Sequence, residues 1–294
     1  MFRCISLVCL VLATMFSGSG FAAVSSAPSP TESGSIAETT NNKKTNIINK
    51  IMADSGMDAL VYQLPAVVAM EFDRQPPPPV NRERFDKFRE NVLQAYAPDK
   101  VRQSFVNYLS DHYDPERFSK LVELLESPLA KKMTALEVEA QTAEGQQAMM
   151  QMANIIMGQV SPQRMAMVQR LDEVQQATEM LVDIQVMTAK AMMSSMNEIV
   201  PQDQRMSAKE LSQRLEQLRV HAIFPARQYM HLNMVYAYRS TNDDELSQYI
   251  QLHESEVGRW SANLLRNASM SVYDNISAEL AETMKMAFVE NNAL

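Results

Sequence analysis

The stretch DPERFSKLVELLES, from Asp114 to Ser127, decides the fold class. Asp114 has a side chain suited to capping a helix, Pro115 suits the first helical position, and Glu116 suits the positive end of the helix dipole. Apolar side chains then recur in steps of three and four residues: Phe118, Leu121, Val122 and Leu125. This spacing predicts an amphipathic helix with one buried face. Ser127 and the proline after it then predict the start of a second helix.

Other helix starts follow the same logic along the chain. Ser161 is again followed by a proline, and Ser207 together with Glu210 has the spacing of a capping box. The segment from Arg164 to Met196 contains neither proline nor glycine, and its apolar residues recur in steps of three and four. It therefore predicts one long helix.

Glycine and proline usage completes the prediction of the fold class. Only 7 glycines occur among 294 residues, whereas β-proteins need glycine at tight turns and bulges. No stretch shows the period-two alternation of a strand, so the chain is predicted to be all-α. Pro65 is expected to kink or end its helix, and the four prolines at 76–79 predict an extended spacer.

A second stretch, from Leu246 to Ser255, resembles the stretch from Phe118 to Ser127 at an offset of 128 residues. Four positions are identical, and each stretch follows a capping sequence and ends at a serine. The pattern predicts a tandem duplication of a multi-helix bundle unit, with repeat 1 at 45–160 and repeat 2 at 161–294. The alternative is that any two capped amphipathic helices look alike.

The helix, the Glu-Ser-Pro sequence and the basic helix start that follows together resemble the DUF2059 family. The pattern of that family is approximately Ser-Pro-x-Gly between two helices. Ser127 and its proline match this pattern, with Ala130 in place of glycine; Ser255 and Gly258 match it, with Glu256 in place of proline. The resemblance implies an exported bacterial all-helical domain. It supplies no activity and no catalytic residues.

The first residues have the features of a secretory signal peptide. Arg3 precedes an apolar run from Cys4 to Phe16, and the small residues Gly20 and Ala22 suit cleavage after residue 22. Residues 1–22 are therefore predicted to be a signal peptide, and residues 23–44, rich in Ser, Thr and Pro, a flexible linker. The predicted location is the periplasm, or outside the cell. Cys4 and Cys9 are the two cysteines of the chain, so the mature protein would have no disulfide.

Charge and hydropathy indicate the kind of partner. The chain has 27 basic and 35 acidic residues, a net charge of -8, which argues against nucleic acid or an anionic membrane surface. No segment after the signal peptide is long and apolar enough to span a bilayer. A protein is therefore the expected partner, while the oligomeric state is left open.

Histidines and acids offer few candidates for chemistry. None of the four histidines (His112, His221, His231 and His253) has metal-ligand spacing. His253 replaces Leu125 on the buried face of the second copy, so it is either a core histidine or a functional group in a cleft between the copies. Glu126 and Glu254 recur in both copies, either as an acid pair or as local hydrogen-bonding groups. No catalytic, cofactor-binding or metal-binding residue is assigned, and no cofactor is expected.

Methionine is the most unusual feature of the composition, with 23 residues. They cluster in two places: Met149, Met150, Met152, Met157, Met165 and Met167, and then Met187, Met192, Met193 and Met196. Such clusters suit core packing, an adaptable groove for apolar partners, or soft ions such as Cu(I) and Ag(I). Trp260, the single tryptophan, is expected to join the two copies.

Together these features favour a non-catalytic exported protein that binds or scaffolds another protein of the cell envelope. One alternative is a hydrolase-type enzyme that uses acidic residues and His253 in a cleft between the repeats. Another is a methionine-rich protein that binds Cu(I) or Ag(I).

Overall fold

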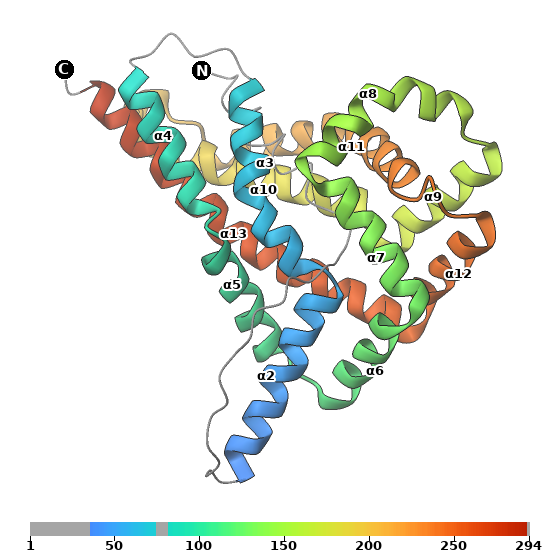
Figure 1. The fold of residues 1–294 in the computed structure, drawn as a ribbon. Helices are drawn as coiled ribbons and strands as arrows, with labels where there is room; N and C mark the ends of the chain where they lie inside the picture. The colour runs from blue at the N-terminus through green and yellow to red at the C-terminus, as the bar shows by residue number, and fades with distance from the viewer. Residues whose placement is uncertain (1–35, 75–81, 293–294) are drawn as a thin grey trace.

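The computed structural model describes residues 36–74 and 82–292, and within these ranges the regular structure is helical throughout (Figure 1). No strand occurs in the described ranges, so the predicted all-α fold is confirmed. The predicted signal peptide and the proline spacer at 76–79 lie outside the described residues. No helix among the described residues is both long enough and apolar enough to cross a membrane.

The first part of the chain forms α2 (Ile36–Asp54), α3 (Met57–Arg74), α4 (Arg82–Ala95), α5 (Pro98–Asp111), α6 (Pro115–Glu126), α7 (Pro128–Gln141) and α8 (Ala143–Gln159). The second part forms α9 (Pro162–Gln175), α10 (Ala177–Ile199), the short 3-10 helix η1 (Gln202–Gln204), α11 (Ala208–Ala237), α12 (Asp243–Glu254) and α13 (Glu256–Asn292).

The predicted helix caps are confirmed. One carboxylate oxygen of Asp114 accepts hydrogen bonds from two backbone N–H groups in the first turn of α6. The hydroxyl groups of Ser127 and Ser161 accept from the third residue of α7 and α9 respectively. Ser207 and Glu210 form the complete capping box at the start of α11. These local bonds satisfy N–H groups that a helix leaves free, which is why each helix begins where it does.

The prediction of one long helix from Arg164 to Met196 is wrong in one respect: the segment forms two helices, α9 and α10. Gln176 adopts the left-handed conformation with φ of 55° and lies between the two helices. The carboxylate of Asp172 accepts hydrogen bonds from the backbone N–H and the hydroxyl of Thr178, at 2.8 Å and 2.6 Å. This side chain therefore starts α10 and compensates for the unfavourable backbone of Gln176.

Two further expectations concern the ends of helices. α2 begins at Ile36, so the residues from there to 44 are helical and the predicted linker at 23–44 is too long at its C-terminal end. No proline or glycine follows Gly34 until Gly56, so nothing in the sequence stops the helix from extending toward the N-terminus. Pro65 lies inside α3 and does not end it.

The buried apolar residues form two clusters, and each combines helices from both parts of the chain. The N-terminal core joins α2 to α6 with α10 and α13, which contributes Leu264, Ala268, Val272, Tyr273, Ile276 and Leu280. The C-terminal core joins α9 to α12 with α7 and α8, which contribute Met133, Ala140 and Met149. In Figure 1, α13 crosses the molecule and packs against α4 and α5, while α7 and α8 pack against α11.

Corresponding helices and corners in the two parts of the chain lie at nearly constant sequence offsets. α6 and α12 have the same length of 12 residues, and α12 begins at Asp243, 128 residues after Pro115. Gly56 and Gln176 lie 120 residues apart and are the residues with positive φ among the described ranges, each at the corner between two helices. The same order of a left-handed corner and a capped 12-residue helix thus occurs twice.

Candidate functional site

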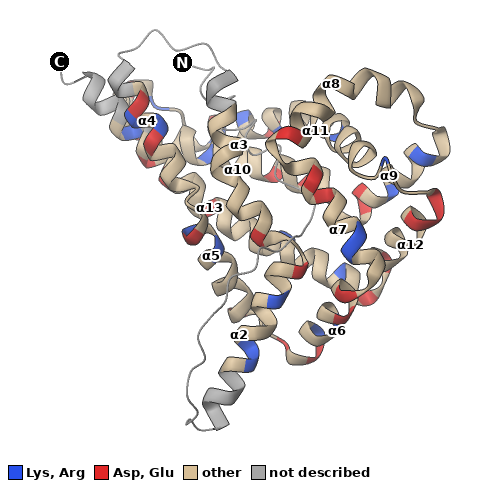
Figure 2. Ribbon diagram, in the orientation of Figure 1, with Lys and Arg blue, Asp and Glu red and all other residues tan. Residues whose placement is uncertain are grey.

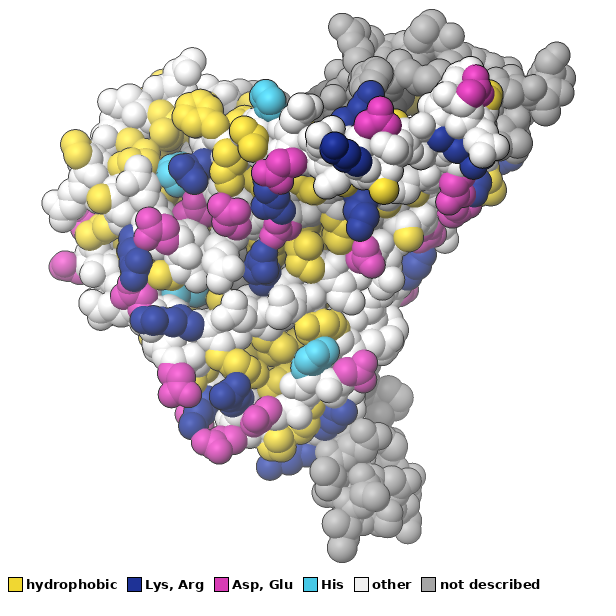
Figure 3. Space-filling model, turned by 180° about the vertical axis from the view of Figure 1, so that it is seen from behind, with side chains coloured by type: hydrophobic (Ala, Val, Ile, Leu, Met, Phe, Trp, Pro, Cys, Tyr) yellow, Lys and Arg dark blue, Asp and Glu magenta, His cyan; other side chains and the backbone are white. Residues whose placement is uncertain are grey.

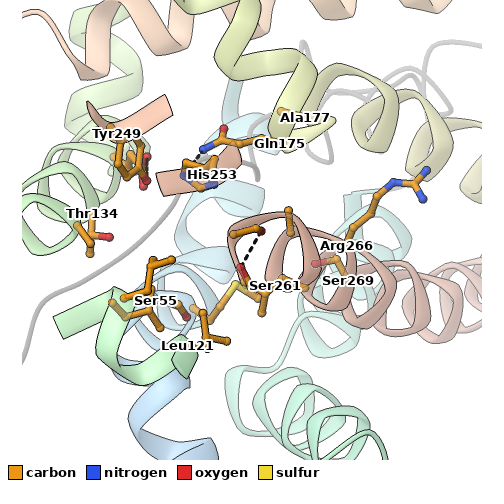
Figure 4. A pocket seen from close by; sticks show the side chains of 18 of the residues that line it. Ser55, Leu121, Thr134, Gln175, Ala177, Tyr249, His253, Ser261, Arg266 and Ser269 are labelled. Atoms are coloured by element: carbon orange, nitrogen blue, oxygen red, sulfur yellow. Dashed lines mark hydrogen bonds between the residues drawn. The ribbon is translucent and has the colours of Figure 1, made fainter. Parts of the chain in front are cut away.

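A cavity of about 150 Å³ lies where α3, α6, α7, α9, α10, α12 and α13 meet, between the two cores. Most of the side chains around this central cavity are apolar, including Leu60, Leu121, Leu125 and Met180 (Figure 4). Polar side chains enter from several helices, and Tyr249 and His253 of α12 lie on one side of it. The mixture of an apolar wall with a few polar groups is typical of small-molecule sites.

Residues 128 positions apart face this cavity together. Five such pairs line it: Leu121 and Tyr249, Leu125 and His253, Ala130 and Gly258, Thr134 and Ala262, and Glu137 and Leu265. The two parts of the chain therefore contribute matching positions to the same wall.

Glu137 is the buried acid of this region. Tyr249 donates a hydrogen bond of 2.8 Å to Oε1 of Glu137, and Tyr238 donates to the same oxygen. Burial raises the pKa of Glu137 to about 7, although the two tyrosine bonds act in the opposite direction. Burial also raises the pKa of both tyrosines above their ordinary value. At neutral pH the tyrosines are therefore uncharged, and the carboxyl is close to half protonated.

His253 faces the cavity from α12. Its Nε2 lies 3.1 Å from the side-chain nitrogen of Gln175, and its ring meets the edge of Tyr249 with centroids 4.6 Å apart. Burial lowers the pKa of His253 to about 4, so the imidazole is neutral at pH 7. A group with so low a pKa is a weak base, which makes His253 poorly matched to general base catalysis at neutral pH.

Three polar atoms in the cavity wall have no hydrogen-bond partner within the described residues. They are the hydroxyl oxygens of Ser55 and Ser269 and the Nε of Arg266. Ser55 is 5% exposed and Ser269 is 0% exposed. Ser261 lines the same wall but donates its hydroxyl proton to the backbone oxygen of Gly258 at 2.9 Å. The cavity thus contains both satisfied and unsatisfied hydroxyl groups.

The two repeated glutamates do not enter the cavity. Glu126 pairs with Lys50 of α2 at 2.8 Å, and Glu254 pairs with Arg170 of α9, whose Nε lies 2.7 Å from the carboxylate. Lys50 and Arg170 are themselves 120 residues apart. The structure therefore holds each glutamate in a helix-to-helix ion pair, and does not bring His253 together with an acid pair.

The remaining histidines lie apart from one another. His112 stacks on Tyr108, and His221 has its Nδ1 2.6 Å from the backbone oxygen of Gln217. His231 lies 3.3 Å from Asp172, at the edge of a second, polar hollow of about 500 Å³. In residues 36–74 and 82–292, no group of three or more His, Asp and Glu side chains is placed to hold a metal ion.

Asp172 joins His231 to the corner between α9 and α10. Burial raises the pKa of Asp172, but hydrogen bonds from His231 and Thr178 outweigh it, so the pKa lies below the ordinary value. The carboxylate is therefore charged at neutral pH while it caps α10 and binds the imidazole. Since the same oxygen atoms hold the helix corner, this pair has a structural function that explains its burial.

The first methionine cluster is divided between core and surface. Met149 is 0% exposed within the C-terminal core, whereas Met150 is 56% exposed on the same helix. Met152 and Met157 of α8 are also exposed, and Met165 and Met167 of α9 are half-buried against the core. In the second cluster, Met192 is buried and Met187, Met193 and Met196 are half-buried.

Large apolar side chains are exposed on α8 and α11, two helices that pack against each other. We define the α8–α11 surface by the large apolar side chains that are exposed there: Met150, Met152, Ile155 and Met157 of α8, and Val220 and Phe224 of α11. Phe224 is 65% exposed, the highest value in the group. Figure 3 shows hydrophobic side chains gathered over the part of the molecule to which these two helices belong.

The sequence alone did not single out Glu137 or the unsatisfied serines. It also did not show that α8 exposes several of its methionines. Glu137 lies four residues after Met133 and three before Ala140, on the buried face of α7. An acidic residue on an otherwise apolar helix face was the signal that could have revealed it. Ser55 and Ser269 had no such signal, since serine occurs freely at helix corners and in helices.

Trp260 contacts the first part of the chain, although it lies in α13. Its ring packs against Phe118 of α6 with centroids 5.7 Å apart, and the guanidinium of Arg117 lies 5.6 Å from the centre of the same ring. The residue 128 positions earlier, Lys132, pairs with Glu245 of α12. Glu245 is in turn 128 positions after Arg117. The two contacts are therefore reciprocal between corresponding positions.

Comparison with known proteins gives a match, to a family of bacterial proteins, over part of the chain. No curated protein and no solved structure matches the chain significantly. Residues 99–163 match the model of DUF2059, described as an uncharacterized protein conserved in bacteria. The matched segment runs from α5 to the start of α9 and includes Ser127, so the resemblance seen in the sequence is confirmed there. Over residues 99–163 the chain is thus similar to the DUF2059 family of uncharacterized bacterial proteins.

Proposed function

We propose that the chain is an exported, non-catalytic helical protein that binds another protein of the cell envelope through the α8–α11 surface. The observation that carries the proposal is the exposure of this surface. Six large apolar side chains are solvent-exposed on two helices that pack together. Solitary exposed apolar residues are common, whereas several on two helices that pack together point to an interaction site.

The composition of the surface supports a protein partner. No charged residue occurs between Glu144 and Arg164, although 21% of the chain is charged. Figure 2 shows the exposed part of α8 without basic or acidic residues, in contrast to the mixed charges elsewhere. Protein interfaces are depleted in charge at their centre and enriched in methionine and aromatic residues. Methionine side chains also adapt to partners of different shape. The proposed contact surface of the partner is therefore apolar and uncharged.

The proposal includes two diverged copies of one helical unit, at 45–160 and 161–294. It is supported by the equal spacing of α6 and α12, by Gly56 and Gln176 at matching corners, and by the matching Lys50–Glu126 and Arg170–Glu254 pairs. Asp114 and Asn242 cap the paired helices from the same position, 128 residues apart. Two unrelated amphipathic helices would not be expected to share corners, caps and ion pairs.

The copies, in this proposal, have exchanged their last helices. α13 of the second copy packs against α4 and α5 as well as along α10 of its own copy, and α7 with α8 of the first copy packs against α11. The reciprocal contacts of Trp260 with Arg117 and of Lys132 with Glu245 have the form expected at a twofold axis.

Export to the periplasm forms part of the proposal and rests on the signal-peptide pattern of residues 1–22. The bacterial family matched by residues 99–163 supports a bacterial compartment. The two alternatives receive less support. The hydrolase alternative needs acidic residues with His253 in one cleft; Glu137 lines the same cavity as His253, but Glu126 and Glu254 form ion pairs elsewhere, and burial lowers the pKa of His253 to about 4. The soft-metal alternative needs grouped thioethers, whereas the first cluster is divided between core and surface.

Site-specific photocrosslinking in bacteria that export the chain tests the proposed partner surface. A benzoylphenylalanine at Gln151, exposed between Met150 and Met152, should yield one reproducible crosslinked protein, identified by mass spectrometry. The same group at Tyr62, 55% exposed on α3, should not yield it. Met150→Lys should reduce the crosslink about tenfold or more, because a charge at the centre of an apolar interface must be desolvated.

The matched control is Met286→Lys, which places the same charge on an exposed methionine of α13. It should leave the crosslink unchanged. Equal crosslinking from Gln151 and Tyr62, or a crosslink unaffected by Met150→Lys, would contradict the proposal. A crosslink to a second copy of this chain would also overturn it, and would identify the surface as a self-association site.

A further inference from the structure

The central cavity combines an apolar wall with buried polar atoms that have no partner. Ser55 enters from the corner between α2 and α3 and Ser269 from α13, whereas the guanidinium of Arg266, also of α13, points away from the other labelled side chains (Figure 4). Within the described residues, neither serine hydroxyl nor the Nε of Arg266 makes a hydrogen bond. Buried polar groups without partners destabilise a protein, so most are satisfied by protein, water or ligand. The two serine hydroxyls in one cavity wall point to something that binds there.

The size of the cavity limits what can bind. A volume of about 150 Å³ is comparable with that of engineered cavities that bind benzene. Leu60, Leu121, Leu125 and Met180 supply the apolar wall, which would hold the body of such a molecule. A longer chain, a nucleotide or a sugar with several hydroxyl groups would exceed this volume.

The charges around the cavity set a second limit on the kind of molecule that can bind. His253 is neutral at pH 7, and both tyrosines that bond Glu137 are neutral. The terminal nitrogen of Arg266 is already paired with Asp183, which also pairs with Arg219. An anion would therefore lose its hydration without meeting an unpaired positive charge, and a cation would meet only Glu137, which is about half protonated at pH 7 and already bonded to two tyrosines. An uncharged molecule avoids this cost.

We propose that the central cavity binds a small uncharged molecule of the size of one six-membered ring that carries a single oxygen. The apolar body lies against the leucine and methionine side chains. The oxygen, as a hydroxyl or a carbonyl, bonds with the unsatisfied hydroxyl of Ser55 or Ser269. This site is separate from the α8–α11 surface, and its existence does not depend on the proposed partner.

Phenol and toluene are suitable probes, because both have seven heavy atoms and only phenol carries an oxygen. Binding is measured on the full mature chain by the ¹³C-methyl NMR signals of Met57 and Met180, which line the cavity. Phenol should shift both signals to saturation at one site per chain, and should bind more tightly than toluene by about three- to tenfold, the effect of one hydrogen bond.

Ser55→Ala and Ser269→Ala remove the unsatisfied hydroxyls one at a time. At least one of them should remove the preference for phenol over toluene while leaving the unliganded protein as stable as before, or more stable. Ser261→Ala is the matched control: it removes a hydroxyl from the same wall that is already bonded to Gly258, and should leave the preference intact. Circular dichroism checks that each variant is folded.

Three results would overturn the inference. The first is the absence of shifts at Met57 and Met180 up to the solubility of both probes. The second is equal affinity for phenol and toluene in the wild-type protein. The third is a preference for phenol that survives both Ser55→Ala and Ser269→Ala.

Discussion

At the residue scale, Glu137 shows how burial changes the chemistry of one side chain. It accepts hydrogen bonds from Tyr238 and Tyr249 in the region where α7 meets α11 and α12. An ionised carboxylate at this depth would be strongly disfavoured, which is why burial raises its pKa to about 7. The two tyrosines partly offset that effect, since both can donate to the charged form. A residue of this kind links protein stability to pH.

The pH dependence of stability should change in Glu137→Gln. An unfolded glutamate loses its proton near pH 4.5, whereas the folded carboxyl keeps it to about pH 7. The stability that the protonated carboxyl contributes is therefore complete below pH 4.5 and is lost as pH rises to 7. Glutamine keeps the acceptor oxygen and has no proton to lose. Between pH 4.5 and 8, the free energy of unfolding of the variant should rise relative to wild type by up to about 3 kcal/mol.

Urea unfolding at several pH values measures this difference. Glu139→Gln is the control, because Glu139 is an exposed glutamate of the same helix and pairs with Arg239. The control should not reproduce the change. Parallel pH profiles for wild type and Glu137→Gln would show that the buried carboxyl does not titrate as described.

At the scale of the elements, the sharp corner between α12 and α13 depends on Gly258. Its backbone N–H donates to the hydroxyl of Ser255 at 3.0 Å, in the capping position. A Cβ atom at Gly258 would lie 2.1 Å from the backbone oxygen of Leu252. Gly145 has the corresponding environment at the corner between α7 and α8, where Thr142 is the cap. These two corners bring consecutive helices closer than a side chain would allow.

Gly258→Ala should destabilise the protein by about 2 kcal/mol or more, because backbone atoms must move to accommodate the methyl group. Gly158→Ala is the matched control. It lies in α8, and a Cβ atom there would meet nothing within 4 Å. That variant should be as stable as wild type or more stable by up to about 1 kcal/mol, since alanine favours helix. Thermal unfolding compares the two, and equal stabilities would refute the close approach at the corner.

Sequence patterns predicted the helices whose ends are fixed by local bonds. Asp114, Ser127 and Ser207 cap the helices that their positions indicated. The break at Gln176 was not predictable, because a left-handed glutamine carries no signature and is stabilised by Asp172 from the preceding helix. The central cavity could not be predicted either, since its wall is drawn from seven helices that extend from α3 to α13 along the chain. Local chemistry determines helix ends, whereas packing determines the site.

At the scale of the whole molecule, each core is completed by helices from the other part of the chain. α13 supplies six of the buried side chains of the N-terminal core, and Met133, Ala140 and Met149 of α7 and α8 belong to the C-terminal core. Neither part has a full apolar core without the other. The DUF2059 match covers α7 and α8 but not α13. The matched segment therefore contains two helices whose buried side chains belong to the C-terminal core, which is built mainly by helices beyond the match.

The central claim is that two related units form one fold by exchanging their last helices, and fragment complementation tests it most directly. The chain is cut in the loop between α8 and α9, into residues 23–160 and 161–294. Each fragment alone should lack a cooperative thermal transition as a monomer, because its core is missing the exchanged helices. The mixed fragments should form a 1:1 complex with native helicity and a single transition. Two fragments that each fold cooperatively as monomers, and do not associate, would contradict the claim.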